Sequence, residues 1–358
     1  MSDPKWIWQH ADWPAFRWHG DRVPALLRAC QLAQGRLLGA VGSVGAEAGL
    51  ETELDALLQN IITSSAIAGE ELNASSVRSS LAKRLGVEGD ADGRRTPRSE
   101  GLAELMVDAT QHHAKALDLP RLFHWHRLLF PAGETPLPVR MRVGELRDGL
   151  DGQVDAFLAW FETSASSATV DPLLRAGIAH FWFVTLHPFD DGNGRLTRAI
   201  TDLALAQAEH QAIRFYSMSA SILAERSGYY RVLEQSQNGG LDITDWLLWF
   251  LQALLDSLQQ ALSRIDRVLG KARFWRRHGE QMLSAEQRKV INRLLDGGER
   301  GFEHGINASQ YQTVAKVSKA TATRHLGDLT EKGLLRRLPG GGRSTRYEID
   351  WSDSRTAR

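Results

Sequence analysis

The segment HPFDDGNGRLTR, residues 187–198, lies between two helical patterns and decides how the rest of the chain is interpreted. The apolar run at 172–186 predicts a buried helix, and Pro188 favours a turn directly after it. Residues 191–194, Asp-Gly-Asn-Gly, are poor helix formers, whereas helix-forming residues resume at 196–209. The sequence therefore predicts a helix, a loop of small residues, and the N-terminus of a second helix.

This loop has the residue types of a phosphate-binding site. Glycine lets a ligand approach the backbone closely, and the free N–H groups at the start of a helix bind anions. Arg195 and Arg198 lie three positions apart, so both guanidinium groups can reach one polyphosphate. Asp191 offers an oxygen ligand for Mg²⁺, and His187, which titrates near neutrality, can accept a proton from an attacking hydroxyl. The combination predicts a nucleotide-dependent transfer reaction, and it lacks the Lys and Ser/Thr of a Walker loop.

The composition of the whole chain excludes several other classes of protein. Its 358 residues contain 43 basic and 43 acidic side chains, so no global charge indicates a nucleic acid or an acidic membrane as partner. The single Cys30 rules out an intramolecular disulfide and a Cys-rich zinc site. The N-terminus lacks the apolar core of a secretory signal, and the most apolar run, 176–186, is shorter than the ~20 residues of a membrane span. We therefore expect a soluble, cytoplasmic protein without a membrane partner.

Helical patterns dominate, so we expect an all-α fold with a small β-wing only near the C-terminus. Three domains are predicted: an N-terminal helical unit at 1–87, a catalytic domain at 100–268, and a winged helix-turn-helix domain at 284–350. Helices are expected at about 51–68, 101–119, 122–130, 155–163, 172–186, 196–209, 220–237, 243–268, 285–295, 308–317 and 319–332. The tryptophans near the N-terminus indicate either a binding surface or aromatic packing, and packing is the favoured interpretation; they are Trp6, Trp8, Trp13 and Trp18.

The motif at 187–198 resembles the core motif of the Fic family, His-Pro-Phe-x-Asp/Glu-Gly-Asn-Gly-Arg-x-x-Arg, at all nine fixed positions. The resemblance extends over at least Leu102 to Leu254, and it implies transfer of AMP from ATP to a Ser, Thr or Tyr hydroxyl of a protein. It further implies that His187 is the general base, that Asp191 holds Mg²⁺, and that pyrophosphate leaves. The phosphate contacts that it implies come from Gly192, Asn193 and Gly194 at the α-phosphate and from Arg195 and Arg198 at the β- and γ-phosphates.

Other interpretations of these residues stay open. His187 can be a helix C-cap, the Gly-Asn-Gly stretch a simple turn, and the two arginines a solvated face. Three residues on one later expected helix are similar to the adenine pocket of the family, with ordinary helix packing as the alternative; they are Tyr229, Tyr230 and Gln237.

The helix that ends in ITSSAIAGEELN resembles the inhibitory helix of the family, whose pattern is Ser/Thr-x-x-x-Glu-Gly/Asn. Aligning Ser64 and Gly69 places Ala68 at the position of the inhibitory Glu, which in the family pairs with the second motif arginine, here Arg198. A methyl group cannot accept that guanidinium, so we expect a de-repressed enzyme. On a continued helix Glu70 would point to roughly the opposite face, and Gly69 is expected to end the helix before it.

Two further segments concern the partners. Family members usually carry a β-hairpin flap that holds the target by strand addition, but here only MRVGELRDG (141–149) resembles its approach, so a shortened flap is expected. Residues 318–333 resemble a winged-helix recognition helix, with DNA binding or a protein contact as its alternative roles. The residues predicted to contact DNA are Lys319, Thr321, Thr323, Arg324, Arg343 and Arg346.

Three functions are compatible with the sequence. The preferred one is a protein adenylyltransferase that uses ATP as co-substrate and Mg²⁺, acting on a target protein or on itself. The second is a DNA-binding regulator that uses a Fic domain as a sensor. The third is a hydrolase that removes AMP from a modified protein, and Ala68 argues against it because that activity tends to need the inhibitory Glu. The sequence leaves a homodimer open.

Overall fold

The structure is a computed structural model that describes residues 6–41, 46–87, 93–132, 141–167, 169–210, 215–297, 302, 304–339 and 345–352. These residues form fourteen α-helices, one 3₁₀ helix and one two-stranded sheet, so the expected all-α class is confirmed. The chain divides into two compact units, residues 1–262 and 263–358. The predicted division into three domains stays a prediction. Among the described residues, none of the helices combines the length and the apolar character needed to cross a bilayer.

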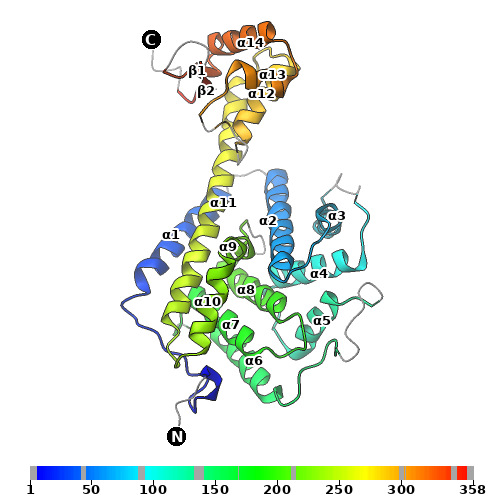
Figure 1. Cartoon of the computed structure of the whole chain (residues 1–358), viewed down its shortest axis with the longest axis vertical. Coiled ribbons are helices and arrows are strands. Elements are labelled where there is room, and N and C mark those ends of the chain that lie inside the picture. Colours follow the sequence, from blue (N-terminus) through cyan, green and yellow to red (C-terminus); the bar gives the residue numbers. More distant parts are fainter. Residues whose placement is uncertain are drawn as a thin grey trace. The chain divides into compact units, whose positions relative to one another are not determined.

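The first unit contains ten complete helices besides a short 3₁₀ helix (Figure 1). These elements are η1 (Ile7–Gln9), α1 (Pro24–Val41), α2 (Ala46–Ile67), α3 (Ala74–Leu85), α4 (Pro97–Gln111), α5 (Leu119–Leu129), α6 (Asp151–Ala165), α7 (Pro172–Leu186), α8 (Asn193–Glu209), α9 (Met218–Ala224) and α10 (Arg226–Gln237). Helix α11 (Thr244–His278) begins in this unit and ends in the second one.

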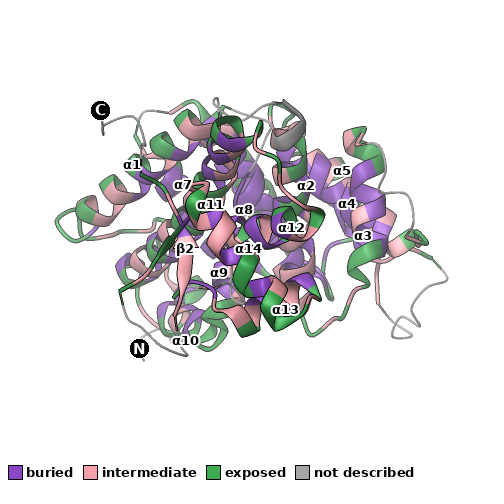
Figure 2. Cartoon of the chain, turned by 90° about the horizontal axis from the view of Figure 1, so that it is seen from above, coloured by how far each residue is buried: buried purple, intermediate pink, exposed green. Residues whose placement is uncertain are grey.

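Helices α7 and α8 lie side by side at the centre of the first unit (Figure 1). Most residues of both helices are buried, and α8 is coloured as buried along most of its length in Figure 2. A buried polar contact fixes α2 against α8, because Asn60 Nδ2 donates to Asp202 Oδ2 at 2.6 Å. The end of α2 therefore lies beside the helix that follows the loop at 187–192.

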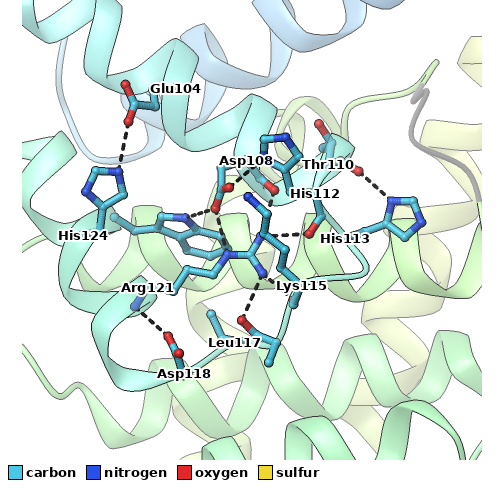
Figure 3. Close-up of polar contacts among 12 residues, drawn as sticks. Glu104, Asp108, Thr110, His112, His113, Lys115, Leu117, Asp118, Arg121 and His124 are labelled. Carbon is cyan, nitrogen blue, oxygen red and sulfur yellow. Dashed lines mark hydrogen bonds and ion pairs between the residues drawn. The ribbon is translucent and has the colours of Figure 1, made fainter.

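A polar cluster joins α4 to α5 and fixes the second of these helices (Figure 3). Asp108 Oδ2 accepts hydrogen bonds from Arg121 Nε at 2.8 Å and from Trp125 Nε1 at 2.7 Å. The same Arg121 donates to the carbonyl oxygens of Asp108 and Lys115, which closes the turn between the helices. These charged hydrogen bonds hold the pKa of Asp108 below its usual range despite its partial burial. The cluster sets the position of α5. His126, which follows Trp125 in this helix, contacts the motif loop.

Several helix boundaries differ from the sequence-based expectations. The helix at 172–186 is confirmed at both ends, but α8 begins at Asn193 and not at 196. The single helix expected at 220–237 is two helices that meet at Glu225. Helices α1 and α3 were not expected, because their apolar residues are interleaved with small and polar ones.

The second unit contains α12 (Ala285–Asp296), α13 (Ala308–Ala315), α14 (Lys319–Glu331), β1 (Leu335–Arg337) and β2 (Tyr347–Ile349). The strands pair antiparallel, with Leu335 opposite Ile349, and Tyr347 also bridges to Ile306. Ser318 caps α14, as the predicted break implies. Helices and strands thus follow in the order expected for a winged helix, and that assignment stays a prediction.

Candidate active site

His187 ends α7 and begins the motif loop. It is the C-cap of that helix, with φ 49° and ψ 55°, so the C-cap interpretation and a catalytic role are compatible. The residue is exposed, and Arg147 holds the backbone at its carbonyl group and at the next residue. Arg147 Nη1 donates to the His187 carbonyl oxygen at 3.0 Å, and its N–H donates to the Pro188 carbonyl oxygen at 2.8 Å. Desolvation by neighbouring protein atoms lowers the pKa of the imidazole, and the charge of Arg147 acts in the same direction.

Asn193 closes the motif loop from within. Its Oδ1 accepts from the Phe189 N–H at 2.9 Å, and its Nδ2 donates to the Phe189 carbonyl oxygen at 2.8 Å. Both amide atoms of this buried side chain are therefore used inside the loop, and its predicted contact with the α-phosphate stays a prediction.

Gly192 is the N-cap of α8 and has φ 80°, a conformation that favours glycine. A Cβ at this position would also lie 2.9 Å from Phe130 Cε2, so the loop has no room for a side chain here. Gly194 follows in the first turn of α8, where a Cβ would lie 3.3 Å from Arg198 Nη1. Conformation and close packing thus explain the glycine at position 192, whereas Gly192 and Asn193 are themselves buried, so phosphate binding at the N-terminus of α8 stays a prediction.

His126 of α5 supports the motif loop, and no sequence motif indicated it. Its Nε2 lies 3.0 Å from the Asp191 carbonyl oxygen, and its Nδ1 lies 2.7 Å from the Gly144 N–H. A carbonyl only accepts and an N–H only donates, so the imidazole is neutral with its proton on Nε2. Burial lowers the pKa of His126, which agrees with a neutral ring. The ring stacks on Phe189 with 4.1 Å between centroids, so one buried side chain joins the loop to the segment before α6.

Asp191 is the predicted metal ligand. Its side chain is 66% exposed and its Oδ2 lies 3.9 Å from Arg195 Nη2, while Oδ1 accepts from the Gly192 N–H. Within the part of the chain that the structure describes, no cluster of three or more His, Cys, Asp or Glu could hold a metal ion. Asp191 nonetheless fits Mg²⁺ bound through phosphates, because that ion often takes one carboxylate and completes its shell with phosphate oxygens and water.

Arg195 is buried and paired, so the alternative interpretation of the motif arginines as a solvated face is wrong for this residue. Its Nη1 donates to both carboxylate oxygens of Glu70, at 2.8 and 2.9 Å, and Arg98 pairs with the same carboxylate. Helix α2 ends at Ile67, and Gly69 adopts φ 81° and lets the chain leave the helix, as expected. Glu70 therefore lies beyond the helix, where the helical-wheel argument does not apply, and it pairs with Arg195 and not with Arg198, the arginine that the inhibitory Glu contacts in the family. Its side chain reaches the motif arginine that was expected to bind phosphate.

Arg198 contacts the residue that aligns with the start of the inhibitory pattern. Its Nε donates to Ser64 Oγ at 2.7 Å and its Nη2 donates to the Ser64 carbonyl oxygen at 2.8 Å. Burial lowers the pKa of Arg198 from its ordinary value. Ala68 is exposed and follows the last residue of α2. The end of α2 contacts Arg198 and the segment after it contacts Arg195, although the expected Glu position carries a methyl group.

The residues predicted for an adenine pocket have different environments. Tyr229 is buried, and its O–H donates to His180 Nε2 at 3.0 Å. The Nδ1–H of His180 donates in turn to Thr201 Oγ1 at 2.9 Å. Burial lowers the pKa of His180 to about 3, so this ring is neutral. Tyr230 is 49% exposed, and Gln237 Nε2 donates to Thr185 Oγ1 at 3.0 Å. Packing thus explains Tyr229, and the adenine role of all three stays a prediction.

The residues predicted to contact DNA are only partly available. Lys319, Thr323 and Arg324 are exposed on α14, whereas Thr321 is half-buried and its N–H donates to Ser318 Oγ. Arg346 Nη1 donates to the Gly305 carbonyl oxygen at 2.8 Å, so it supports a turn of the domain. Arg343 lies outside the described residues. DNA binding stays a prediction.

Comparison with known proteins identifies the fold around this loop. Residues 116–205 match the Fic/DOC family. The chain contains a Fic domain. The resemblance seen in the motif is thereby confirmed for the segment that carries it. Residues 6–87, ahead of the Fic domain, match a family described only as a domain of unknown function (DUF4172).

Curated relatives of the Fic domain are named protein adenylyltransferases. One from Drosophila sechellia is 25% identical over 197 residues, which are 52% of this chain and 39% of that protein. Another, fic-1 of Caenorhabditis elegans, is 35% identical over 74 residues, 21% of this chain and 13% of that protein. The chain thus spans well under half the length of these relatives.

Two solved structures share the fold. A Fic family protein from Desulfovibrio desulfuricans has a TM-score of 0.51 at 19% identity and covers 93% of this chain and 98% of its own. A Fic domain containing signaling protein from Bacteroides thetaiotaomicron has a TM-score of 0.50 at 15% identity and covers 66% and 97%, respectively. At these identities the likeness shows the fold alone.

Proposed function

We propose that the protein transfers the adenylyl group of ATP to a hydroxyl of a protein. The observation that carries the proposal is one loop that combines an exposed His187, a glycine N-cap on α8 and the buried guanidinium of Arg195. The Fic domain and its adenylyltransferase relatives support the choice of ATP and of a protein target.

In the proposed reaction the target hydroxyl gives its proton to His187, whose lowered pKa keeps it neutral and able to accept near pH 7. The hydroxyl oxygen forms a bond to the α-phosphorus, and the bond from that phosphorus to pyrophosphate breaks. Arg195 and Arg198 would stabilise the charge of the leaving pyrophosphate. Mg²⁺, held at Asp191, would supply further neutralisation of the phosphates when bound.

The contacts at the end of α2 bear on regulation. The guanidinium of Arg195 is bound to the Glu70 carboxylate, and the guanidinium of Arg198 donates to Ser64. We infer that a polyphosphate competes with Glu70 for Arg195, so an enzyme with Ala68 is still restrained in part. Full de-repression is therefore not expected of the native chain.

Two preparations of ATP, radiolabelled at the α- or the γ-phosphorus, test the reaction type. The proposal predicts that the label appears on protein from the α position alone and disappears in His187→Ala. Label from the γ position would indicate phosphoryl transfer and contradict the proposal. Loss of AMP from a pre-modified protein would support the hydrolase instead.

A further inference from the structure

A cleft of about 330 Å³ opens beside His187, and neither the motif nor the comparisons assign it a ligand. Its walls come from the N-terminal segment, from the residues before and within α6, and from the end of α7; they include Trp8, Trp13, Leu150, Gln153, Thr185 and Leu186. Of the described motif residues only His187 lines it. The cleft is therefore separate from the glycines and arginines of the phosphate site, and His187 belongs to both.

Backbone hydrogen bonds anchor the N-terminal segment at Arg17, four residues after Trp13. The Arg17 N–H donates to the Leu241 carbonyl oxygen at 2.8 Å, and the Ile243 N–H donates to the Arg17 carbonyl oxygen at 2.9 Å. Trp13 packs edge-to-face on Trp182, with 6.5 Å between centroids. The packing interpretation of the N-terminal tryptophans thus explains Trp13.

Packing does not explain Trp8. It stacks on Trp6 at 4.9 Å between centroids, yet 43% of Trp8 remains exposed, and Trp8 lines the cleft. An exposed, rigid indole beside a reactive group is typical of a binding surface.

Arg147 and Asp148 place two charges in the lining of the cleft. Arg147 donates to the His187 carbonyl oxygen at 3.0 Å, and the Asp148 carboxylate accepts from Arg142 Nη1 at 2.7 Å. Gln153 and Thr185 add neutral hydrogen-bonding groups, and the indoles of Trp8 and Trp13 supply apolar surface, so the lining is mixed. A ligand that matches this lining combines an apolar group that packs on the indoles with groups that form hydrogen bonds.

We propose that the cleft binds the target segment that carries the modified hydroxyl, with an aromatic or large aliphatic residue next to that hydroxyl packed against Trp8 and Trp13. This rests on the proposed function, because a base must face the hydroxyl on one side and the phosphate on the other. The volume is near the lower end of the ~300–1,000 Å³ range of ligand pockets, so it suits one or two side chains of an extended segment. Trp8 and Trp13 would thus take over part of the role of a full flap, which is to hold the target segment.

The test measures binding in the absence of ATP, so it does not depend on catalysis. Fluorescently labelled full-length protein is titrated with peptides that contain one Ser, Thr or Tyr, flanked by Phe, Leu, Gly, Lys or Glu. Tight binding to Phe and Leu peptides is expected, about tenfold above the Gly, Lys and Glu peptides, and Trp8→Ala should remove that difference.

Two variants control the test. Trp351→Ala removes another exposed tryptophan, 57% exposed in the second unit, and should leave the preference intact. Trp8→Phe keeps an aromatic face and should retain most of it, while circular dichroism confirms that each variant is folded. No preference in the wild type, or a preference that survives Trp8→Ala, would overturn the proposal. Selective binding without any AMP transfer once ATP is added would refute the proposed function and leave the cleft assignment standing.

Discussion

The contact between Glu70 and Arg195 leads to a quantitative prediction about ATP binding. Arg195 Nη1 lies 2.8 and 2.9 Å from the two carboxylate oxygens of Glu70, and the side chains of Glu70 and Arg195 are only 26% and 4% exposed. A hydrogen bond to a charged group of this kind contributes about 1.5–3 kcal/mol. Glu70 keeps Arg98 as a partner when it leaves Arg195, so we expect the lower end of that range. Since about 1.4 kcal/mol corresponds to a factor of ten, Glu70→Ala should bind ATP about tenfold more tightly.

Isothermal titration calorimetry with Mg²⁺ and a non-hydrolysable ATP analogue measures this change. AMP is the matched ligand control: it lacks the phosphates assigned to Arg195, so its affinity should be the same in both proteins. Glu71→Ala is the matched protein control, because Glu71 is exposed and adjacent in the chain. Equal gains for AMP and the ATP analogue, or no gain for either, would refute the competition between Glu70 and phosphate.

Three other predictions concern the loop and its metal. Replacing His126 by Ala leaves the Asp191 carbonyl and the Gly144 N–H without their partner, so the free energy of unfolding should fall by about 1–3 kcal/mol in thermal unfolding and adenylyl transfer should slow. His126→Gln should recover part of both the stability and the rate. An unchanged transfer rate in His126→Ala would contradict the role of His126. A general base is active when neutral, so kcat/KM should rise with pH through the pKa of His187, with a midpoint below the ordinary value of about 6.5; a midpoint above it would contradict the structure. Chelation of divalent cations should abolish transfer without lowering the melting temperature of the nucleotide-free protein, since Asp191 is exposed and holds no metal-dependent contact; a lower melting temperature would indicate a structural metal site instead.

The sequence predicted those parts of the fold that depend on local pattern. The apolar run at 172–186, bounded by Asp171 and Pro172 on one side and His187 on the other, defined α7 at both ends. The glycines of the motif loop indicated a break before a second helix, and the positive φ of Gly192, the N-cap of α8, agrees with that prediction. Local pattern was insufficient at Glu225, where no Gly or Pro marks the break between α9 and α10.

Contacts between distant segments could not be predicted in the same way. The position of Glu70 depends on how the chain leaves Gly69, and a helical wheel contains no information on residues after the helix. His126 lies 65 positions before Asp191 in the sequence, and a lone histidine in an amphipathic helix gives no signal of a contact at that separation. Trp8 and His187 lie 179 positions apart in the sequence and line one cleft, and no local pattern around either residue indicates that proximity.

The central claim is that His187 catalyses transfer of an adenylyl group, and the intact mass of the purified protein after incubation with Mg²⁺ and ATP tests it most directly. His210→Ala is the matched control for His187→Ala, because both histidines are exposed helix C-caps with φ of 51° and 49°. The account predicts that the wild type and His210→Ala gain one adenylyl group per modified site, when the protein or an added target supplies the hydroxyl, and that His187→Ala gains none. A mass gain that persists in His187→Ala would contradict the account.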